Sequence, residues 1–287
     1  MLPILVSYTG SSLLFAILPL FAFLTPSSAA PVDGSPLDDG YRDMYNMDFS
    51  GAHKAFADWE RVHPEDPVGP ASDAAAYLFT EFERLHILRS EFLTQDSSFL
   101  SSHRLKPDPA TKAAFEKALE RSRNLSQEML KRGEDKERAT FASVVCTALH
   151  ADYLALIEKE NWQALNEIKE ATSQAEALVA KNPNLKDAYL SMGVENYLLS
   201  QKVGPVRMFL RLTGAQTDKE VGLQKLRIVA DQGHYFKPYA KILLAIAALR
   251  DKNRALAGRL MAELASEFPG NDLFKEEVKK LSCSVDC

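Results

Sequence analysis

The sequence predicts an all-α protein in which consecutive helices pair as hairpins and stack into an array. Three observations support this. Apolar residues recur with a helical period in almost every segment, and no segment shows the convincing alternation of a half-buried strand. Breakers rich in proline and glycine separate the segments. One pattern of small and apolar residues that ends in proline occurs in three places. We expect about ten or eleven helices, arranged as a degenerate α-α superhelix.

The N-terminus differs from the rest of the chain, because residues 1–31 contain no charged side chain. Residues 12–24 form an apolar run that is too short to span a bilayer comfortably, and a proline interrupts it. Ser28 and Ala30 have the small side chains that signal peptidase prefers, although no Lys or Arg precedes the run and Pro31 follows the cut. We expect a signal peptide over residues 1–30, cleaved after Ala30 or Ala29. The mature protein is then periplasmic or secreted; the alternative is an uncleaved membrane anchor.

A linker and a tail enclose the predicted helical domain. Residues 31–39 are rich in Pro, Gly and Asp and are expected to be a linker, followed by the domain at 40–281 and a tail at 282–287. Cys283 and Cys287 lie in or beside this tail, where an oxidising compartment could join them in a short loop that adds little stability. Cys146, on an apolar stripe, is expected to be a small buried hydrophobe.

The helices that follow the linker are each predicted from an apolar face. The first, in 48–67, has alanines and aromatics at regular steps and ends at a proline. The face of the second consists of Leu78, Phe82, Leu85 and Phe92. The stripe of the fourth consists of Ala142, Val145, Cys146, Leu149 and Tyr153. After 48–67, the expected helices span residues 71–92, 109–131, 134–158, 161–181, 185–201, 206–213, 218–232, 235–250, 254–267 and 272–281. Residues 97–109 are the longest irregular stretch and a candidate flexible loop.

The recurring pattern has a small residue, two packing residues and a proline at offsets 0, +4, +7 and +12. Its three copies are Ala52, Phe56, Trp59 and Pro64; Ala171, Ala175, Leu178 and Pro183; and Ala257, Met261, Leu264 and Pro269. The small residue allows a neighbouring helix to approach closely, and the proline ends the helix. Gly40 stands where a repeat that ends at Pro64 needs its small residue. The alternative is that a helical bundle produces this spacing by chance.

The pattern resembles the tetratricopeptide repeat (TPR), a helix–turn–helix unit of 34 residues. The stretches "MYNMDFSGAHKAF" and "GVENYLLSQKVGPVRMFLRLTGAQTDKEVGL" also resemble the outer-membrane tetratricopeptide family, which includes tetratricopeptide repeat protein 39 and the yeast inclusion-body clearance protein. The matching positions are Gly193, Asn196, Asp218, Lys219, Gly222 and Leu223, with Thr217 where the family has glycine. The resemblance implies a helical-repeat protein that works by association, and it carries over no catalytic residue.

The sequence therefore favours a non-catalytic scaffold or adaptor of the cell envelope that binds a protein or peptide partner. A net charge of −5 argues against a nucleic-acid binder. Glu195 and Asn196 interrupt an apolar helix and are candidate ligand contacts, as are the candidates that follow them in sequence, Lys202, Arg207 and Arg211. For Glu195 and Asn196 the sequence favours an internal polar network over a ligand contact. The amphipathic segment from Val206 to Leu212 is a candidate for peripheral membrane contact or for packing on the core.

Two other functions are weighed against the scaffold. A TPR protein that binds a small ligand and serves a transporter would have a closed, apolar pore, whereas a scaffold would have an open, polar groove. An enzyme would need a catalytic group, and Cys146 lies one helical turn before His150. Glu83 and His86 form an E-x-x-H motif without the second copy that a di-iron site requires. We expect no metal and no cofactor.

Overall fold

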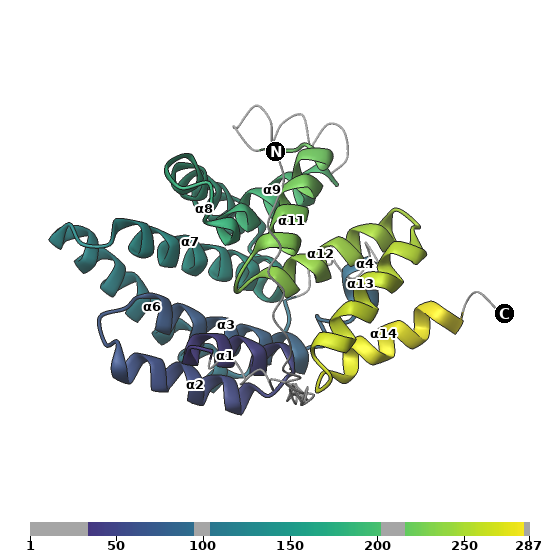
Figure 1. The fold of residues 1–287 in the computed structure, drawn as a ribbon, viewed down its shortest axis with the longest axis horizontal. Helices are drawn as coiled ribbons and strands as arrows, with labels where there is room; N and C mark the ends of the chain where they lie inside the picture. The colour runs from purple at the N-terminus through teal and green to yellow at the C-terminus, as the bar shows by residue number, and fades with distance from the viewer. Residues whose placement is uncertain (1–33, 95–103, 202–215, 284–287) are drawn as a thin grey trace, which may run out of the picture. The chain divides into compact units, whose positions relative to one another are not determined.

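The computed structural model describes residues 34–94, 104–201 and 216–283. Within these residues the structure consists of twelve α-helices, one π turn and one 3-10 turn, and it contains no β-strand. Each α-helix packs against its neighbours (Figure 1). The predicted all-α class and its array of packed helices are therefore confirmed.

The chain forms the following elements in order. They are α1 (Pro36–Tyr45), α2 (Phe49–Val62), α3 (Val68–Arg84), α4 (Ser90–Thr94), α6 (Pro109–Arg132), α7 (Lys136–Tyr153), the π turn η1 (Leu154–Glu158), α8 (Asn161–Lys181), the 3-10 turn η2 (Lys186–Ala188), α9 (Tyr189–Ser200), α11 (Lys219–Gln232), α12 (Lys237–Arg250), α13 (Arg254–Glu267) and α14 (Asp272–Cys283). Helices α8 and α13 have the predicted bounds. The segment from Val206 to Leu212 lies outside the described residues.

Part of the predicted linker is helical, because α1 begins at Pro36 rather than after residue 39. Ser35 accepts a hydrogen bond from the backbone N–H of Asp38, and the Asp38 side chain accepts one from the backbone N–H of Ser35. This capping box, with proline at the first helical position, starts the helix. Gly40 then lies so close to α2 that a Cβ atom there would be 2.3 Å from Cε1 of Phe56.

The single helix predicted over residues 71–92 is wrong, because α3 ends at Arg84 and the short α4 begins at Ser90. Between them His86 has a φ angle of 58°, in the left-handed region that non-glycine residues rarely adopt. The N–H of Ile87 donates to the carbonyl of Phe82 at 2.8 Å, which closes the turn. The apolar period continues through this turn, so the sequence pattern does not reveal it.

The recurring proline has the same structural role in all three predicted copies. Pro64, Pro183 and Pro269 each follow a C-cap residue with an extended φ of −124°, −134° and −124°, respectively. In each case the N–H of that cap donates to the carbonyl four residues earlier. Proline disfavours helical conformation in the residue before it, which explains why all three helices stop there. The small residues of the three copies are fully buried: Ala52, Ala171 and Ala257.

A fourth copy of the spacing occurs in α11, where the sequence analysis did not find it. Gly222, Leu226 and Val229 have offsets 0, +4 and +7, and His234 replaces the proline at +12. Leu226 and Val229 are fully buried. A Cβ atom at Gly222 would lie 2.5 Å from the backbone nitrogen of Tyr197, so only glycine permits this approach of α11 to α9.

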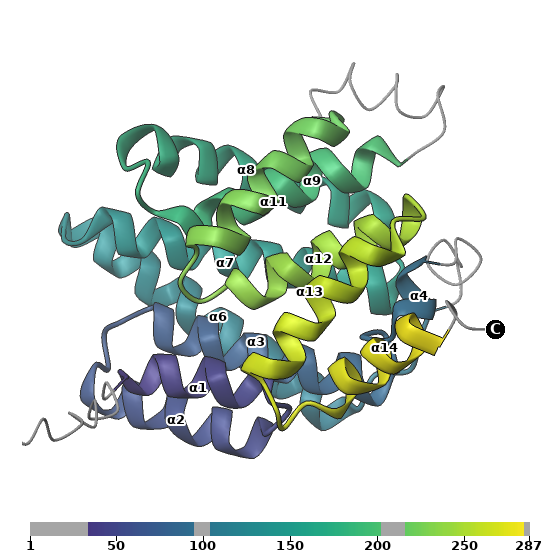
Figure 2. The same ribbon diagram turned by 45° about the vertical axis from the view of Figure 1, so that its right-hand side comes forward.

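The first and last hairpins of the array are in contact. The N–H of Gly270, between α13 and α14, donates to Oδ1 of Asn46 at 2.8 Å, and Nδ2 of Asn271 donates to the carbonyl of Tyr45 at 2.8 Å. On another side, the Ser90 hydroxyl in α4 donates to Glu277 in α14 at 2.7 Å. Figure 2 shows α14 beside α4. The array therefore differs from an open solenoid, in which each repeat contacts only its neighbours.

Helix α7 lies among α3, α6 and α8. Together with η1 it forms, within the described residues, the one helix that is long and apolar enough to cross a membrane by length and composition. More than half of its apolar window is buried against the rest of the protein. Packing between helices accounts for this apolar character.

Candidate functional site

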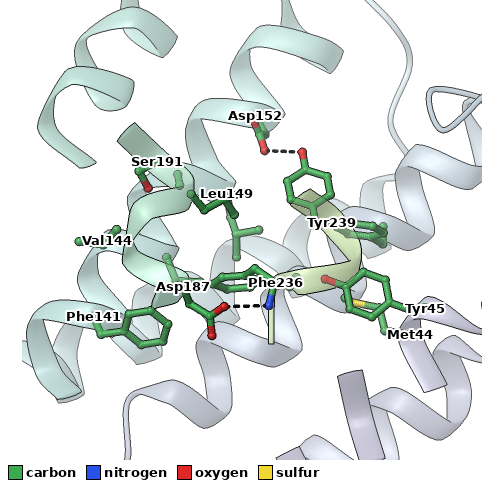
Figure 3. Close-up of a pocket in the computed structure, with 15 residues that line it drawn as sticks. Met44, Tyr45, Phe141, Val144, Leu149, Asp152, Asp187, Ser191, Phe236 and Tyr239 are labelled. Atoms are coloured by element: carbon green, nitrogen blue, oxygen red, sulfur yellow. Dashed lines mark hydrogen bonds between the residues drawn. The ribbon is translucent and has the colours of Figure 1, made fainter. Parts of the chain in front are cut away.

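Five helices and one turn surround a pocket (Figure 3). Its lining comes from α1, α3, α7, η2, α9 and the start of α12, and its cavity volume is about 50 Å³. Because one water needs about 10–15 Å³ of cavity space, the pocket has room for a few waters or for one small aliphatic side chain. Most of the wall is apolar or aromatic, and its aromatic residues are Tyr45, Phe79, Phe141, Phe236 and Tyr239.

The pocket has a buried end and a more accessible end. The lining residues that are partly exposed are Ala148, Asp152, Leu190, Ser191 and Tyr239, from α7, α9 and α12. The residues opposite them, including Met44, Phe141 and Asp187, are buried. In Figure 3 Asp152 and Ser191 lie at the upper end, and Phe141, Asp187 and Met44 at the lower end. Solvent therefore reaches the pocket from the side of α7, α9 and α12.

Asp187, at the buried end, holds the chain between α11 and α12. Its carboxylate accepts hydrogen bonds from the backbone N–H groups of His234, Tyr235 and Phe236 at 3.0, 2.9 and 3.2 Å. Burial raises the pKa of this carboxyl, and the three N–H donors oppose that rise. Asp187 is thus a structural group that fixes the first residues of α12 against η2.

Asp152, at the accessible end, is much less satisfied. It stands in the last turn of α7, two residues before the π turn begins. Its carboxylate accepts one hydrogen bond, from the hydroxyl of Tyr239, and that bond is long at 3.4 Å. Burial raises the pKa of Asp152 to about 7, although the bond from Tyr239 opposes the rise. The pocket thus has a carboxyl poised to change charge near neutral pH.

Within the described residues, no basic side chain lines the pocket beside this carboxyl. Among the fifteen residues that line the pocket there is no Lys, Arg or His. His150, two residues before Asp152, is engaged by Glu167, whose Oε2 lies 2.6 Å from Nδ1 of His150. Asp187, the other carboxylate of the lining, is held by three backbone N–H groups, whereas within the described residues Asp152 accepts only the long bond from Tyr239, and this missing compensation distinguishes it.

The predicted contacts Glu195 and Asn196 are buried in a polar network that fixes the start of α11. Glu195 accepts from the backbone N–H of Gln216 at 3.0 Å, and Asn196 accepts from that of Asp218 at 3.2 Å. Nδ2 of Asn196 also donates to Oε1 of Gln216 at 2.5 Å. These bonds correspond to the internal polar network considered for Glu195. The other three candidate contacts lie outside the described residues: Lys202, Arg207 and Arg211.

The residues that carried the family resemblance meet where α9 crosses α11. Gly193 and Gly222 lie at the crossing, since a Cβ atom at Gly222 would be 3.0 Å from the carbonyl oxygen of Gly193. Asn196 binds the N–H of Asp218, and Asp218 accepts from the N–H groups of Glu220 and Val221, which caps α11. The pattern thus describes a helix crossing and its cap, which is a structural role.

The Cys146–His150 hypothesis is disfavoured. Cys146 is fully buried, and burial raises the pKa of its thiol to about 11, so it remains protonated at neutral pH.

His86 of the E-x-x-H motif lies beyond the end of α3. Within the described residues, no group of three or more His, Cys, Asp or Glu side chains is placed to hold a metal ion. Ala30 and Cys287 lie outside those residues, so the cleavage and the disulfide with Cys283 stay predictions.

The sequence analysis missed Asp152 and Tyr239 as site residues. A signal was present for Asp152, because it follows Val145 and Leu149 at offsets of seven and three on the apolar stripe of α7. No sequence signal near either residue relates Asp152 to Tyr239, which is 87 residues away.

No protein-family model, curated protein or solved structure matches the chain.

Proposed function

We propose that this protein binds a protein partner by receiving one of its residues in the pocket beside Asp152, and that it acts as a non-catalytic scaffold or adaptor. The observation that carries this proposal is a pocket with apolar walls and room for one small aliphatic side chain, in which no described lining residue supplies a counter-charge for the carboxyl of Asp152. A carboxylate against apolar walls without a cation is costly, so a ligand that supplies one gains affinity there.

The proposal includes a TPR-like array that is exported to the cell envelope. Four helices with the same small-and-apolar spacing support the repeat, and three of them stop before a proline with the same cap geometry. The contacts between the first and last hairpins are a departure from an open superhelix. N-terminal sequencing of the protein from its own host tests export: a start at Ala30 or Pro31 is expected, and intact Met1 contradicts it.

The second candidate is a protein that binds a small ligand and serves a transporter. It is favoured by the apolar walls of the pocket and by the contact between the two ends of the array. The pocket volume argues against it, because drug-sized ligands occupy roughly 300–1,000 Å³. A space of about 50 Å³ suits a part of a larger partner better than a whole ligand.

Photo-crosslinking in the host distinguishes the two candidates. A diazirine analogue of leucine is placed at Leu190, a partly exposed residue of the pocket lining, or at Leu260 of α13, which is also partly exposed but does not line the pocket. We expect a polypeptide adduct from position 190 and none from position 260. A small-molecule adduct at 190, or the same polypeptide adducts at both positions, contradicts the proposed function.

A further inference from the structure

The accessible end of the pocket places a carboxyl directly beside an apolar space. Asp152 and Tyr239 approach each other there, and Leu149 and Phe236 extend the wall toward the buried end (Figure 3). A ligand that matches both features has a cationic group attached close to an apolar group. The cation stays at the accessible end and the apolar group fills the space below it.

The hydrogen-bonding capacity of Asp152 indicates which cation fits. An ionised carboxylate has about four acceptor positions, and Tyr239 uses one of them. An ammonium group donates three hydrogen bonds, whereas a guanidinium group has five N–H donors in a rigid fork. Besides Asp152, the polar side chains at the accessible end are the hydroxyls of Tyr239 and Ser191, so three donors of an ammonium group are satisfied there more completely than five donors of a guanidinium group.

The distance between the cation and the apolar group selects among ammonium groups. A lysine ammonium lies at the end of four methylenes, away from the backbone and from neighbouring side chains. The α-ammonium of an N-terminal residue is one carbon atom from its own side chain. Only the second arrangement places both groups in a pocket that accommodates one side chain.

We propose that Asp152 binds the free α-ammonium group of a partner chain whose first residue is apolar, with the side chain of that residue filling the pocket. This inference rests on the proposed function and names the part of the partner that is recognised. The Asp152 carboxylate forms an ion pair with the ammonium, and the walls of α1, α3, α7 and α12 bury the side chain.

The other titratable groups of the lining are Tyr45 in α1, Asp187 in η2 and Tyr239 in α12, and α3 and α9 contribute none. Burial raises the pKa of both tyrosines well above 10, and three backbone N–H groups hold Asp187. The pKa of Asp152 is about 7, and that of an α-amino group is roughly 7.7–8.0. Affinity should therefore be highest between about pH 7 and 8, and should fall on both sides.

Titration calorimetry of the purified protein with tripeptides X-Gly-Gly tests the inference, with Ala, Val, Ile or Leu as X. We expect binding of at least one tripeptide at pH 7.5 and a loss of at least tenfold on N-acetylation. Asp152→Asn should weaken the free tripeptide at least tenfold and leave the acetylated one unchanged. The inference is overturned if the parent and Asp152→Asn bind a tripeptide equally well, or if N-acetylation leaves the affinity unchanged. It is also overturned if none of the four tripeptides binds.

Two further ligands identify the source of the ammonium. A free amino acid that binds tenfold more tightly than its tripeptide overturns the assignment to a chain terminus. N-acetyl-Leu-Lys-Gly amide that binds as tightly as Leu-Gly-Gly overturns it in favour of an internal lysine. An affinity that stays constant between pH 7.5 and 9 also indicates an internal lysine, because a lysine keeps its charge in that range.

A second variant keeps the test independent of Asp152. Ala148→Phe fills the accessible end of the pocket and should abolish binding of every tripeptide. Ala114→Phe is the matched control, because Ala114 is also partly exposed but does not line the pocket. Failure of the inference about the α-ammonium group is distinguishable from failure of the proposed function. A polypeptide adduct at Leu190 without tripeptide binding refutes the inference alone, whereas tripeptide binding without a polypeptide adduct refutes the proposed function.

Discussion

The hydroxyl of Tyr45 donates a hydrogen bond of 3.1 Å to the backbone carbonyl of Tyr235, 190 residues later in the chain. This bond joins the first helix to the turn between α11 and α12. The ring of Tyr41, one helical turn earlier, stacks on the ring of Tyr235 with centroids 4.7 Å apart. The first hairpin is therefore integrated with the second half of the array.

Removal of this hydroxyl should weaken the whole array. Tyr45→Phe leaves the partly buried carbonyl of Tyr235 without this donor, so we expect the free energy of unfolding to fall by about 1 kcal/mol. Chemical denaturation with a single cooperative transition measures this value. Tyr77→Phe is the control, because the Tyr77 hydroxyl makes no hydrogen bond within the described part of the chain. A two-step transition in which only the first hairpin melts early contradicts the integrated array.

Local signals account for the elements that the sequence predicted well. Helix α13 begins after Asn253, whose side chain caps the N–H of Leu256, and it ends before Pro269. Both signals lie within or beside the helix, so its bounds, 254–267, agree with the prediction. The turn at His86 has no such signal, because the apolar period continues from α3 into α4.

The pocket was beyond sequence reasoning for a different reason. Its two polar partners at the accessible end, Asp152 and Tyr239, belong to α7 and α12, and only tertiary packing brings them together. The buried end depends on Asp187, which binds three backbone N–H groups of a distant turn. A pattern along one helix can show that Asp152 is an exception on an apolar stripe, but it cannot identify the partner.

The repeat residues should determine stability according to their burial. Leu178 is 5% exposed, and Leu178→Ala should cost about 2–5 kcal/mol through a cavity. Ala257 is 0% exposed, and Ala257→Leu should cost about 1–3 kcal/mol through overpacking. The controls are Leu130→Ala and Ala255→Leu, at exposed positions. Denaturant melts measure all four variants, and parent-like melting of both Leu178→Ala and Ala257→Leu refutes the proposed repeat register.

The ion pair between Arg138 and Asp66 should matter more than the surface pairs. Nε and Nη2 of Arg138 donate to the two Asp66 oxygens at 2.7 and 2.6 Å, and Nε1 of Trp59 donates to the same carboxylate. Arg138→Met leaves a buried carboxylate without its cation. We expect a cost of about 2–3 kcal/mol, below that of a fully buried pair because Arg138 is partly exposed.

The pH dependence of that variant follows from the pKa of Asp66. Burial raises this pKa, but the bonds from Arg138 and Trp59 more than compensate and hold it below its usual value. The stabilisation is present above the unfolded pKa of about 3.9 and is lost as the pH falls through the folded value. The stability curves of parent and Arg138→Met should therefore converge at acidic pH. Arg138→Lys should lie between them at neutral pH, because lysine cannot bind both oxygens in the same way.

Asp152 should have the opposite pH dependence. Its pKa of about 7 in the folded protein exceeds the value of about 3.9 expected in the unfolded chain. The folded state then holds an extra proton between these values, so the parent loses up to about 1.4 kcal/mol of stability per pH unit as the pH rises through that interval.

Asp152→Asn removes this dependence while keeping an oxygen that can accept from Tyr239. The variant should be more stable than the parent at pH 8, with a difference that shrinks steadily as the pH is lowered toward 4. Melting curves at one-unit pH intervals measure it, and Asp231→Asn, at an exposed position, is the control. If Asp152→Asn tracks the parent across the whole interval, the carboxyl has a counter-charge, and the pocket loses the feature that favours a cationic ligand.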